Sequence, residues 1–446
     1  MARANPTKSI HKGRKSQPPT NAKKSPRPAP ASKTAPAKQP AIKHTPPAKG
    51  LAGQADLSWL PVKLRALYRD EYPRFSEAEM ARRLADIDRI MEAAKIEHLV
   101  LSGAQRNGSI VPWLTGWPVT AEAIGVVTPQ LPTALFVQHY NHLPLAKRLA
   151  RAEVEWGGES TIRRAVDELT RRGARLGRVG VIGSLTYTQH DILAARYGRA
   201  IDLNAAYARL RLVKSDEELE WLRLGAALTD RAMFALRDAL KPGLTEHDLA
   251  DIVERAYVRW GGATHVHYFG ATSMENPDCI VPRQFPSGRR IAKGDVVMTD
   301  ISAAFWEYPG QVLRSFTIGV EPTPLYRKLH RTADMAFQAI LGVLKAGATA
   351  QQVAEVTGII EEAGFTTCDD LVHGFGGGYL PPVLGSKSRP NGPVPDFRFA
   401  AGMTVVVQPN IVTRDGTAGV QTGELVHITE KGAERLQQMP KGFLRV

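Results

Sequence analysis

The stretch from Gly294 to Gly319, GDVVMTDISAAFWEYPGQVLRSFTIG, predicts a β-hairpin that carries a carboxylate where its first strand ends. Val296 to Thr299 is a short run suited to a buried strand, and Asp300 follows it directly. Gln311 to Ile318 is a second such run, and it comes after a Pro-Gly turn. A carboxylate at the end of a buried strand must pair, bind a ligand or accept several hydrogen bonds. Its role therefore depends on the partners that the rest of the chain offers.

The length and composition of the chain predict a globular protein with two domains. Its 446 residues are too many for one ordinary core, and 43% of them are hydrophobic. We find no segment with the roughly eighteen consecutive apolar residues of a membrane span and no apolar core of a secretory signal, so we expect a cytoplasmic protein. Cys279 and Cys368 lie far apart without a CxxC spacing, and we expect both to be reduced thiols.

The net charge of +14 originates in the first part of the chain. Residues 1–50 contain twelve Lys or Arg, ten Pro and no Asp or Glu, so the rest of the chain is close to neutral. Because this composition cannot bury enough apolar surface to offset the entropy of ordering, we expect residues 1–55 to form a disordered basic tail. Residues 1–50 could contact nucleic acid or an anionic surface weakly, or could serve only as a solubilising extension.

Residues 56–210 predict an N-terminal α/β domain with a mixed sheet. Apolar residues at helical spacing from Glu77 to Ala94 precede a strand pattern from His98 to Ser102. Helix and strand patterns then alternate as far as Leu210, which is typical of an α/β domain.

Residues 211–446 predict a second domain that is built from a repeated unit. It begins with a long helix in which Ser215 and Glu218 form a capping box. The segments ALKPGLTEHDLADIVE at Ala239–Glu254 and VLKAGATAQQVAEVTG at Val343–Gly358 share a helix end, a Thr cap and a second amphipathic helix. Each copy precedes a strand-rich stretch. The fold class is therefore α+β, with a duplicated helix-helix-strand unit and a cleft between its two halves.

With these features, the sequence from Leu57 to Val446 resembles the aminopeptidase P, prolidase and creatinase family. The motifs that carry the resemblance are VKSDEELEWLR at Val213–Arg223, GDVVMTDIS at Gly294–Ser302, HGFGGGY at His373–Tyr379, GMTVVVQPN at Gly402–Asn410 and GVQTGELVHITEKGAERL at Gly419–Leu436. The resemblance implies a creatinase-like N-terminal domain, a pita-bread C-terminal domain and a homodimer.

The family's metallopeptidases bind two divalent metals through two Asp, one His and two Glu. Position by position, the resemblance places these ligands at Asp300, Gln311, Gly377, Gln408 and Gly423. A set with about one negative charge does not balance the roughly four positive charges of two metals. We therefore expect no metal centre and no other cofactor. Glu424 could supply a carboxylate only if a β-bulge shifted the strand by one residue.

The pattern of residues behind the metal-free chemistry of creatinase is not matched either, so we do not expect a plain creatinase. The resemblance places the catalytic histidine of creatinase at Arg283 and its carboxylates at Leu313 and Gln408. Arg283 and Gln421 stand where the family usually has His and Arg, so we expect both to alter which substrate charges are accepted.

Three residues remain as catalytic candidates, namely His373, Asp300 and Glu424. The resemblance aligns His373 with a histidine that faces the substrate in the family. A buried Asp300 with a raised pKa would suit a general acid. In the purely structural alternative, Asp300 is held by neighbouring polar side chains. Gln311 and Gln408 keep the shape of carboxylates without their charge, and we expect them to bind a polar substrate.

Two functions are consistent with these residues. The first is a divergent Xaa-Pro peptidase-like or creatinase-like hydrolase that cleaves an amide or another C–N bond of a small molecule or short peptide without metal. The second is a catalytically inactive pseudo-peptidase that binds a peptide or metabolite in the retained cleft. The complete family framework favours the first function, and the basic tail favours the second.

Overall fold

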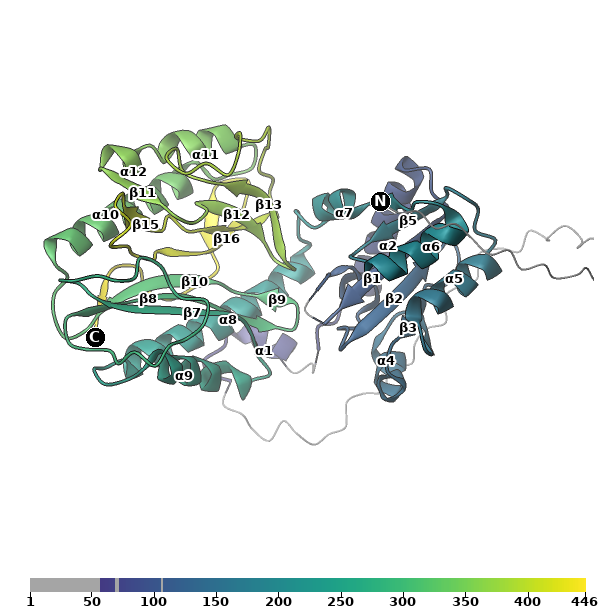
Figure 1. The fold of residues 1–446 in the computed structure, drawn as a ribbon, viewed down its shortest axis with the longest axis horizontal. Helices are drawn as coiled ribbons and strands as arrows, with labels where there is room; N and C mark the ends of the chain where they lie inside the picture. The colour runs from purple at the N-terminus through teal and green to yellow at the C-terminus, as the bar shows by residue number, and fades with distance from the viewer. Residues whose placement is uncertain (1–56, 69–71, 106) are drawn as a thin grey trace, which may run out of the picture. The chain divides into compact units, whose positions relative to one another are not determined.

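The computed structural model describes residues 57–68, 72–105 and 107–446 (Figure 1). The expected basic tail, residues 1–55, lies outside the described residues. The described chain is α+β, as predicted. None of its helices combines the length and the apolar character that crossing a membrane requires.

The first sheet has six strands in the order β4-β3-β2-β1-β5-β6. They are β1 (His98–Ala104), β2 (Glu122–Val127), β3 (Ala134–Val137), β4 (Glu153–Trp156), β5 (Val179–Ile182) and β6 (Ile201–Asp202). Strand β1 pairs antiparallel with β2 and parallel with β5, so the sheet is mixed, as the alternating pattern predicted.

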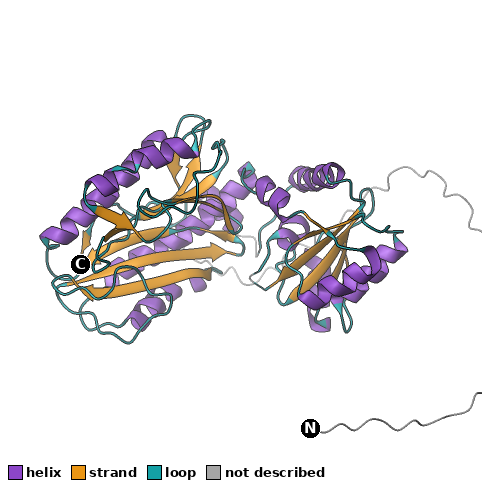
Figure 2. Ribbon diagram, turned by 45° about the horizontal axis from the view of Figure 1, so that its top comes forward, coloured by secondary structure: helices purple, strands orange, loops and turns teal. Residues whose placement is uncertain are grey.

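Helices pack on both faces of this sheet (Figure 2). They are α2 (Glu77–Ala93), α3 (Ile110–Thr115), the 3-10 turn Tyr140–His142, α4 (Leu143–Leu149), α5 (Thr161–Arg171), α6 (Tyr187–Tyr197) and α7 (Asn204–Leu210). Successive side chains of β1 alternate between the faces, so that Leu99 and Leu101 join the core of α2 and α3 while Val100 joins the core of α5 and α6.

The second sheet has ten strands, and its main path runs β13-β12-β14-β16-β10-β8-β7. The strands are β7 (Ala263–Ser273), β8 (Asp295–Phe305), β9 (Tyr308–Pro309), β10 (Val312–Thr317), β12 (Val372–Phe375), β13 (Tyr379–Leu384), β14 (Thr404–Val407), β16 (Gly423–Ile428), β17 (Ala433–Arg435) and β18 (Leu444–Arg445). A separate pair joins β11 (Phe365–Thr367) to β15 (Ile411–Thr413).

Two groups of helices cover this sheet, in agreement with the predicted repeat. They are α1 (Val62–Tyr68), α8 (Asp216–Ala239) and α9 (Glu246–Val258) in one group, and α10 (Pro324–Val343), α11 (Ala350–Val356) and α12 (Ile359–Glu362) in the other. Thr245 caps α9 and Thr349 caps α11, each in a capping box, as the sequence indicated.

The hairpin of β8 and β10 is present, but its first strand is longer than predicted. Strand β8 continues past Asp300 to Phe305, because Ile301 to Phe305 are buried and pair with β7 and β9. Asp300 therefore lies in the middle of β8, opposite Leu313 of β10. Strand alternation places Asp300 on the same face as Val296 and Met298, whose side chains join the core of the second helix group.

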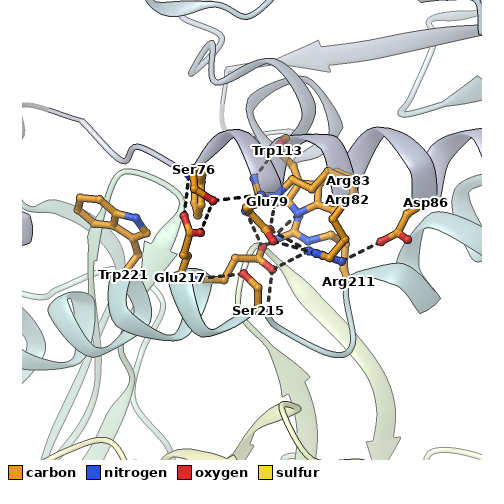
Figure 3. A network of polar contacts seen from close by, with 12 residues as sticks. Ser76, Glu79, Arg82, Arg83, Asp86, Trp113, Arg211, Ser215, Glu217 and Trp221 are labelled. Carbon is orange, nitrogen blue, oxygen red and sulfur yellow. Dashed lines mark hydrogen bonds and ion pairs between the residues drawn. The ribbon is translucent and has the colours of Figure 1, made fainter. Parts of the chain in front are cut away.

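A buried polar network surrounds the start of α8 (Figure 3). Ser215 and Glu218 form the predicted capping box. Glu218 Oε1 also accepts a hydrogen bond from Trp113 Nε1 at 3.1 Å and lies 3.5 Å from Arg83 Nη2 and 3.6 Å from Arg211 Nη2. The Arg83 side chain has no exposed surface. Glu79 Oε1 lies 2.6 Å from Arg83 Nε, so Glu79 and the capping Glu218 together balance the charges of the buried Arg83 and Arg211.

We expect Glu218→Ala to lower the free energy of unfolding by about 3 kcal/mol, because it removes the carboxylate beside the buried Arg211 and leaves the buried Arg83 with Glu79 alone. Asp251→Ala is the matched control, since it breaks an exposed ion pair with Arg255 and should cost less than about 1 kcal/mol. Urea unfolding of both variants measures the two losses. Equal losses would contradict this role of Glu218.

Lys214 is buried beside this network, and its Nζ donates a hydrogen bond to Leu212 O at 3.1 Å. Burial lowers the pKa of Lys214 to about 7, and the charge of Arg211 acts in the same direction. Between pH 7 and the ordinary lysine pKa of 10.5, the unfolded chain therefore binds a proton that the folded chain does not. The contribution of Lys214 to stability rises with pH in this window and is constant below it.

Lys214→Met should remove this dependence. We expect the free energy of unfolding of the wild type, relative to the variant, to rise by up to about 1.4 kcal/mol per pH unit from pH 7 to pH 10. Urea unfolding of both proteins across this range measures the difference. Parallel pH profiles would show that Lys214 stays protonated in the folded state.

Candidate functional site

A cavity of about 390 Å³ brings together most of the residues that the sequence singled out. Its lining consists of His265, Val266, Tyr268, Val281, Pro282, Gln284, Asp300, Gln311, Cys368, Asp369, His373, Phe375, Tyr379, Gln408 and Gln421. The polar candidates come from β8, from β12 and from the residues that flank β10, β14 and β16. A larger cavity of about 660 Å³ is lined mainly by α8 and α9 and contains none of the candidates.

Asp300 and Gln311 form a direct pair in this cavity. Gln311 Nε2 donates a hydrogen bond to Asp300 Oδ1 at 3.0 Å. Gln311 is buried, whereas Asp300 keeps some access to the cavity. Burial raises the pKa of Asp300 to about 7, with a further contribution from the charge of Asp369. Asp300 can therefore both accept and donate a proton near neutral pH.

His373 faces the same cavity from β12 with only 2% of its surface exposed. Its Nδ1 lies 3.2 Å from Gly374 O, and its ring stacks on Tyr379 at a centroid distance of 4.1 Å. Burial lowers the pKa of His373 to about 4, so the imidazole is neutral at pH 7. A carbonyl only accepts hydrogen bonds, so Nδ1 carries the proton and Nε2 is the basic nitrogen.

Asp369 is a cavity residue that the sequence reasoning missed. Asn410 Nδ2 donates to Asp369 Oδ2 at 3.1 Å, the backbone amide of Asp370 donates to Oδ1 at 2.8 Å, and burial raises the Asp369 pKa. Its neighbour Cys368 also lines the cavity, and burial raises the pKa of this thiol to about 11. The sequence feature that could have indicated Asp369 is the pair Asp369-Asp370, which lies just before the buried strand that carries His373.

Two of the predicted site residues are not among those that line the cavity. Glu424 is fully buried and accepts hydrogen bonds from Arg314 Nη2 at 2.7 Å and Arg435 Nη2 at 2.9 Å. Strand β16 pairs with β14 and β10 in regular register at this point, so the chain does not contain the bulge that would turn Glu424 toward Asp300. Arg283 Nη1 instead donates to Glu246 Oε1 at 2.6 Å.

Gly377 and Gly423, at which the resemblance places two metal ligands, are tightly packed. Gly377 has a φ of +83°, and a Cβ on it would lie 2.8 Å from Cζ of Arg211. A Cβ on Gly423 would lie 2.6 Å from Val407 O and 2.8 Å from Cα of Gln408. A ligand side chain at either position would therefore require the surrounding backbone or Arg211 to move.

The donors that remain in the cavity do not fit a dinuclear metal centre. Gln311 and Gln408 contribute neutral amides at two ligand positions, which leaves Asp300 as the single carboxylate of the expected set. Within the part of the chain that the structure describes, no three His, Cys, Asp or Glu side chains are grouped so that they could hold a metal ion.

Comparisons with known proteins agree with the fold. Residues 220–430 match the sequence model of metallopeptidase family M24. A probable dipeptidase PepE from Mycobacterium tuberculosis is 29% identical over 248 residues, which are 53% of this chain and 62% of that protein. An Xaa-Pro dipeptidase from Pyrococcus furiosus is 25% identical over 239 residues, which are 53% of this chain and 66% of that protein. The chain thus spans less than two thirds of these relatives.

Solved structures resemble the chain over a longer stretch. An Xaa-Pro dipeptidase from Bacillus anthracis superposes with a TM-score of 0.70 at 19% identity, covering 82% of this chain and all of that one. Dipeptidase PepE from Mycobacterium ulcerans superposes with a TM-score of 0.69 at 22% identity, covering 84% of this chain and 99% of that one. The predicted architecture, a creatinase-like α/β part followed by a pita-bread part, is confirmed.

Gly377→His tests whether the missing ligand can be restored. We expect the variant to be less stable than the wild type by about 3 kcal/mol and to bind no Mn²⁺, because the histidine meets Arg211. Gly378→His is the matched control, since Gly378 also has a positive φ but has open space around a Cβ. Thermal unfolding and metal analysis after dialysis against MnCl₂ measure both effects. Equal stability of the two variants, or Mn²⁺ retained by Gly377→His, would contradict the steric closure.

Proposed function

We propose that the protein is a peptidase-like hydrolase that works without a dinuclear metal centre, because residues 220–430 match the sequence model of metallopeptidase family M24 while the cavity holds a single carboxylate of the expected ligand set. The proposed reaction is cleavage of an amide or another C–N bond in a small molecule or short peptide. The observation that carries this proposal is that Asp300, whose pKa is raised to about 7, and a neutral His373 line the same cavity of about 390 Å³.

In the proposed mechanism, Asp300 acts as the acid–base residue. Its carboxylate takes a proton from water while the water oxygen forms a bond to the carbonyl carbon, and the carbonyl electron pair moves to oxygen. When the carbonyl re-forms, the C–N bond breaks and the leaving nitrogen takes the proton back from Asp300. His373 Nε2 accepts a hydrogen bond from the attacking water or from the substrate and so orients it.

Neutral side chains would position the substrate around these two residues. Gln311, Gln408 and Gln421 line the cavity and are each no more than 5% exposed. An amide presents both a donor and an acceptor, so these side chains can orient a polar substrate without adding charge. Glu424 and Arg283, which engage other partners, have no direct part in this mechanism.

The alternative is a pseudo-peptidase that binds a peptide or metabolite without turnover. Close packing at Gly377 and Gly423, with amides at two further ligand positions, favours this alternative because it removes the family's metal chemistry while leaving a polar cavity. The homodimer and the cytoplasmic location stay predictions. Nucleic-acid contact through residues 1–50 also stays a prediction, and it lies outside the described residues.

A substrate screen combined with metal analysis separates these functions. We expect purified protein to turn over an Xaa-Pro dipeptide, an N-acyl compound or a creatine-like compound with less than one bound metal per chain and without inhibition by a chelator. Asp300→Asn should lower kcat/KM by about a hundredfold or more, since the acid–base group is lost. His373→Ala should also lower kcat/KM.

His247→Ala is the control, because His247 is exposed on α9 and should leave kcat/KM unchanged. Turnover that needs two equivalents of Mn, Co or Zn would contradict the metal-free mechanism. Binding of these compounds without turnover would establish the pseudo-peptidase.

A further inference from the structure

We infer that Gln284 contacts the ligand at one wall of the cavity of about 390 Å³, and that Glu246 is the positioning residue that holds Gln284 there. The inference rests on the proposed function only in placing the ligand in this cavity. It adds a contact residue and a positioning residue that neither the hydrolase nor the pseudo-peptidase proposal includes. It also gives Arg283 a different role from the expected one, because Arg283 acts on the turn and not on the charge of the substrate.

The connection between β7 and β8, residues 274–294, supplies one wall of the cavity. Val281, Pro282 and Gln284 of this connection are among the lining residues. Pro282 is buried, whereas Gln284 is exposed, so the Gln284 side chain is accessible to a ligand. Its amide offers both a hydrogen-bond donor and an acceptor. Gln284 can therefore bind a polar group of the ligand without adding charge.

Direct packing against β7 fixes the first part of this connection. A Cβ on Gly270 of β7 would lie 3.0 Å from Val281 O and 3.2 Å from Pro282 Cα, so the two backbones approach closely. The backbone amide of Arg283 then donates a hydrogen bond to Phe269 O at 2.8 Å. The connection is thus held against β7 as far as Arg283.

Glu246 holds the turn that follows, residues 283–287, at both of its ends. It is the first residue of α9 and has no exposed surface. Its Oε1 accepts a hydrogen bond from Arg283 Nη1 at 2.6 Å, and its Oε2 accepts one from the Ser287 backbone amide at 2.8 Å. The backbone amide of Ala271 also donates to Oε1, at 3.0 Å. One buried carboxylate therefore connects β7 to both ends of the turn.

The residues inside the turn depend on these contacts for their position. Within the described part of the chain, no hydrogen bond is found for Gln284, Phe285 or Pro286. Hydrogen bonds to an ionised carboxylate are stronger than those between neutral groups, so Glu246 contributes most of the polar stabilisation of the turn. Loss of Glu246 should release Gln284, while Asp300 keeps its own hydrogen bond in the cavity.

Hydrogen exchange of the full-length protein, measured by mass spectrometry, tests the role of Glu246 without any ligand. We expect Glu246→Ala to raise exchange in the peptide that covers residues 283–287 by at least about tenfold, because the Ser287 amide loses its acceptor. Peptides from β12 should exchange as in the wild type. His247→Ala is the matched control, since His247 is the exposed neighbour of Glu246 on α9. Equal exchange of the turn in the two variants would overturn the inference.

Arg283→Met keeps this test decisive if Glu246→Ala fails to fold. It removes one of the three donors to Glu246 and leaves the two backbone amides in place. We expect exchange of the same peptide to rise by about threefold, because one end of the turn is released. Wild-type exchange in Arg283→Met would then overturn the inference.

Steady-state kinetics with L-alanyl-L-proline, N-acetylglycine and creatine test the ligand contact. For a compound that is turned over, we expect Gln284→Ala to raise KM by about fivefold and to leave kcat within about twofold, because a binding hydrogen bond is lost. Glu246→Ala, or Arg283→Met in its place, should also raise KM. The double variant with Gln284→Ala should have no larger effect than Gln284→Ala alone, whereas a merely structural Glu246 would add its own effect. For a compound that binds without turnover, isothermal titration gives Kd in place of KM.

The inference and the proposed hydrolase fail separately. Turnover with the same KM in Gln284→Ala and the wild type, or additive effects in the double variant, would overturn the inference and leave the hydrolase. Binding without turnover that Gln284→Ala weakens would remove the hydrolase and leave the contact. Absence of both binding and turnover for all three compounds would overturn the ligand contact, and hydrogen exchange would still decide the role of Glu246.

Discussion

The contact between Glu218 and Arg211 is the constraint on which the rest of this structure depends. Glu218 caps α8, balances Arg83 and lies 3.6 Å from Arg211, whose guanidinium fills the space beside Gly377. A capping residue and a buried arginine thereby fill the space at Gly377, the position where the resemblance places a histidine ligand. Because the charge of Arg211 also acts on the buried Lys214, the packing at Gly377 is part of the packing around the start of α8.

Burial governs the protonation of the two catalytic candidates in the cavity. It moves the pKa of Asp300 up and that of His373 down. Gln311 and Gln408 stand at two positions where the resemblance places metal ligands, and their amides line the cavity without adding charge. The same neutral, polar lining serves a hydrolase or a binding protein.

The features that the sequence predicted correctly depend on local patterns. The caps at Ser215, Thr245 and Thr349 and the hairpin around Asp300 follow from residues close together in the chain. The missed features depend on contacts between distant segments. Asp369 reaches the cavity through the fold, Glu424 is turned to two arginines by the register of three strands, and the closure at Gly377 involves a residue more than 160 positions earlier in the chain. Local periodicity contains no information about such pairs.

Anomalous diffraction from crystals grown with MnCl₂ tests the central claim, a cavity without the dinuclear metal centre, most directly. We predict no anomalous peak in the cavity beside Asp300. Two Mn²⁺ peaks beside Asp300 would contradict it, since the present donor set would then support the family's metal centre after all.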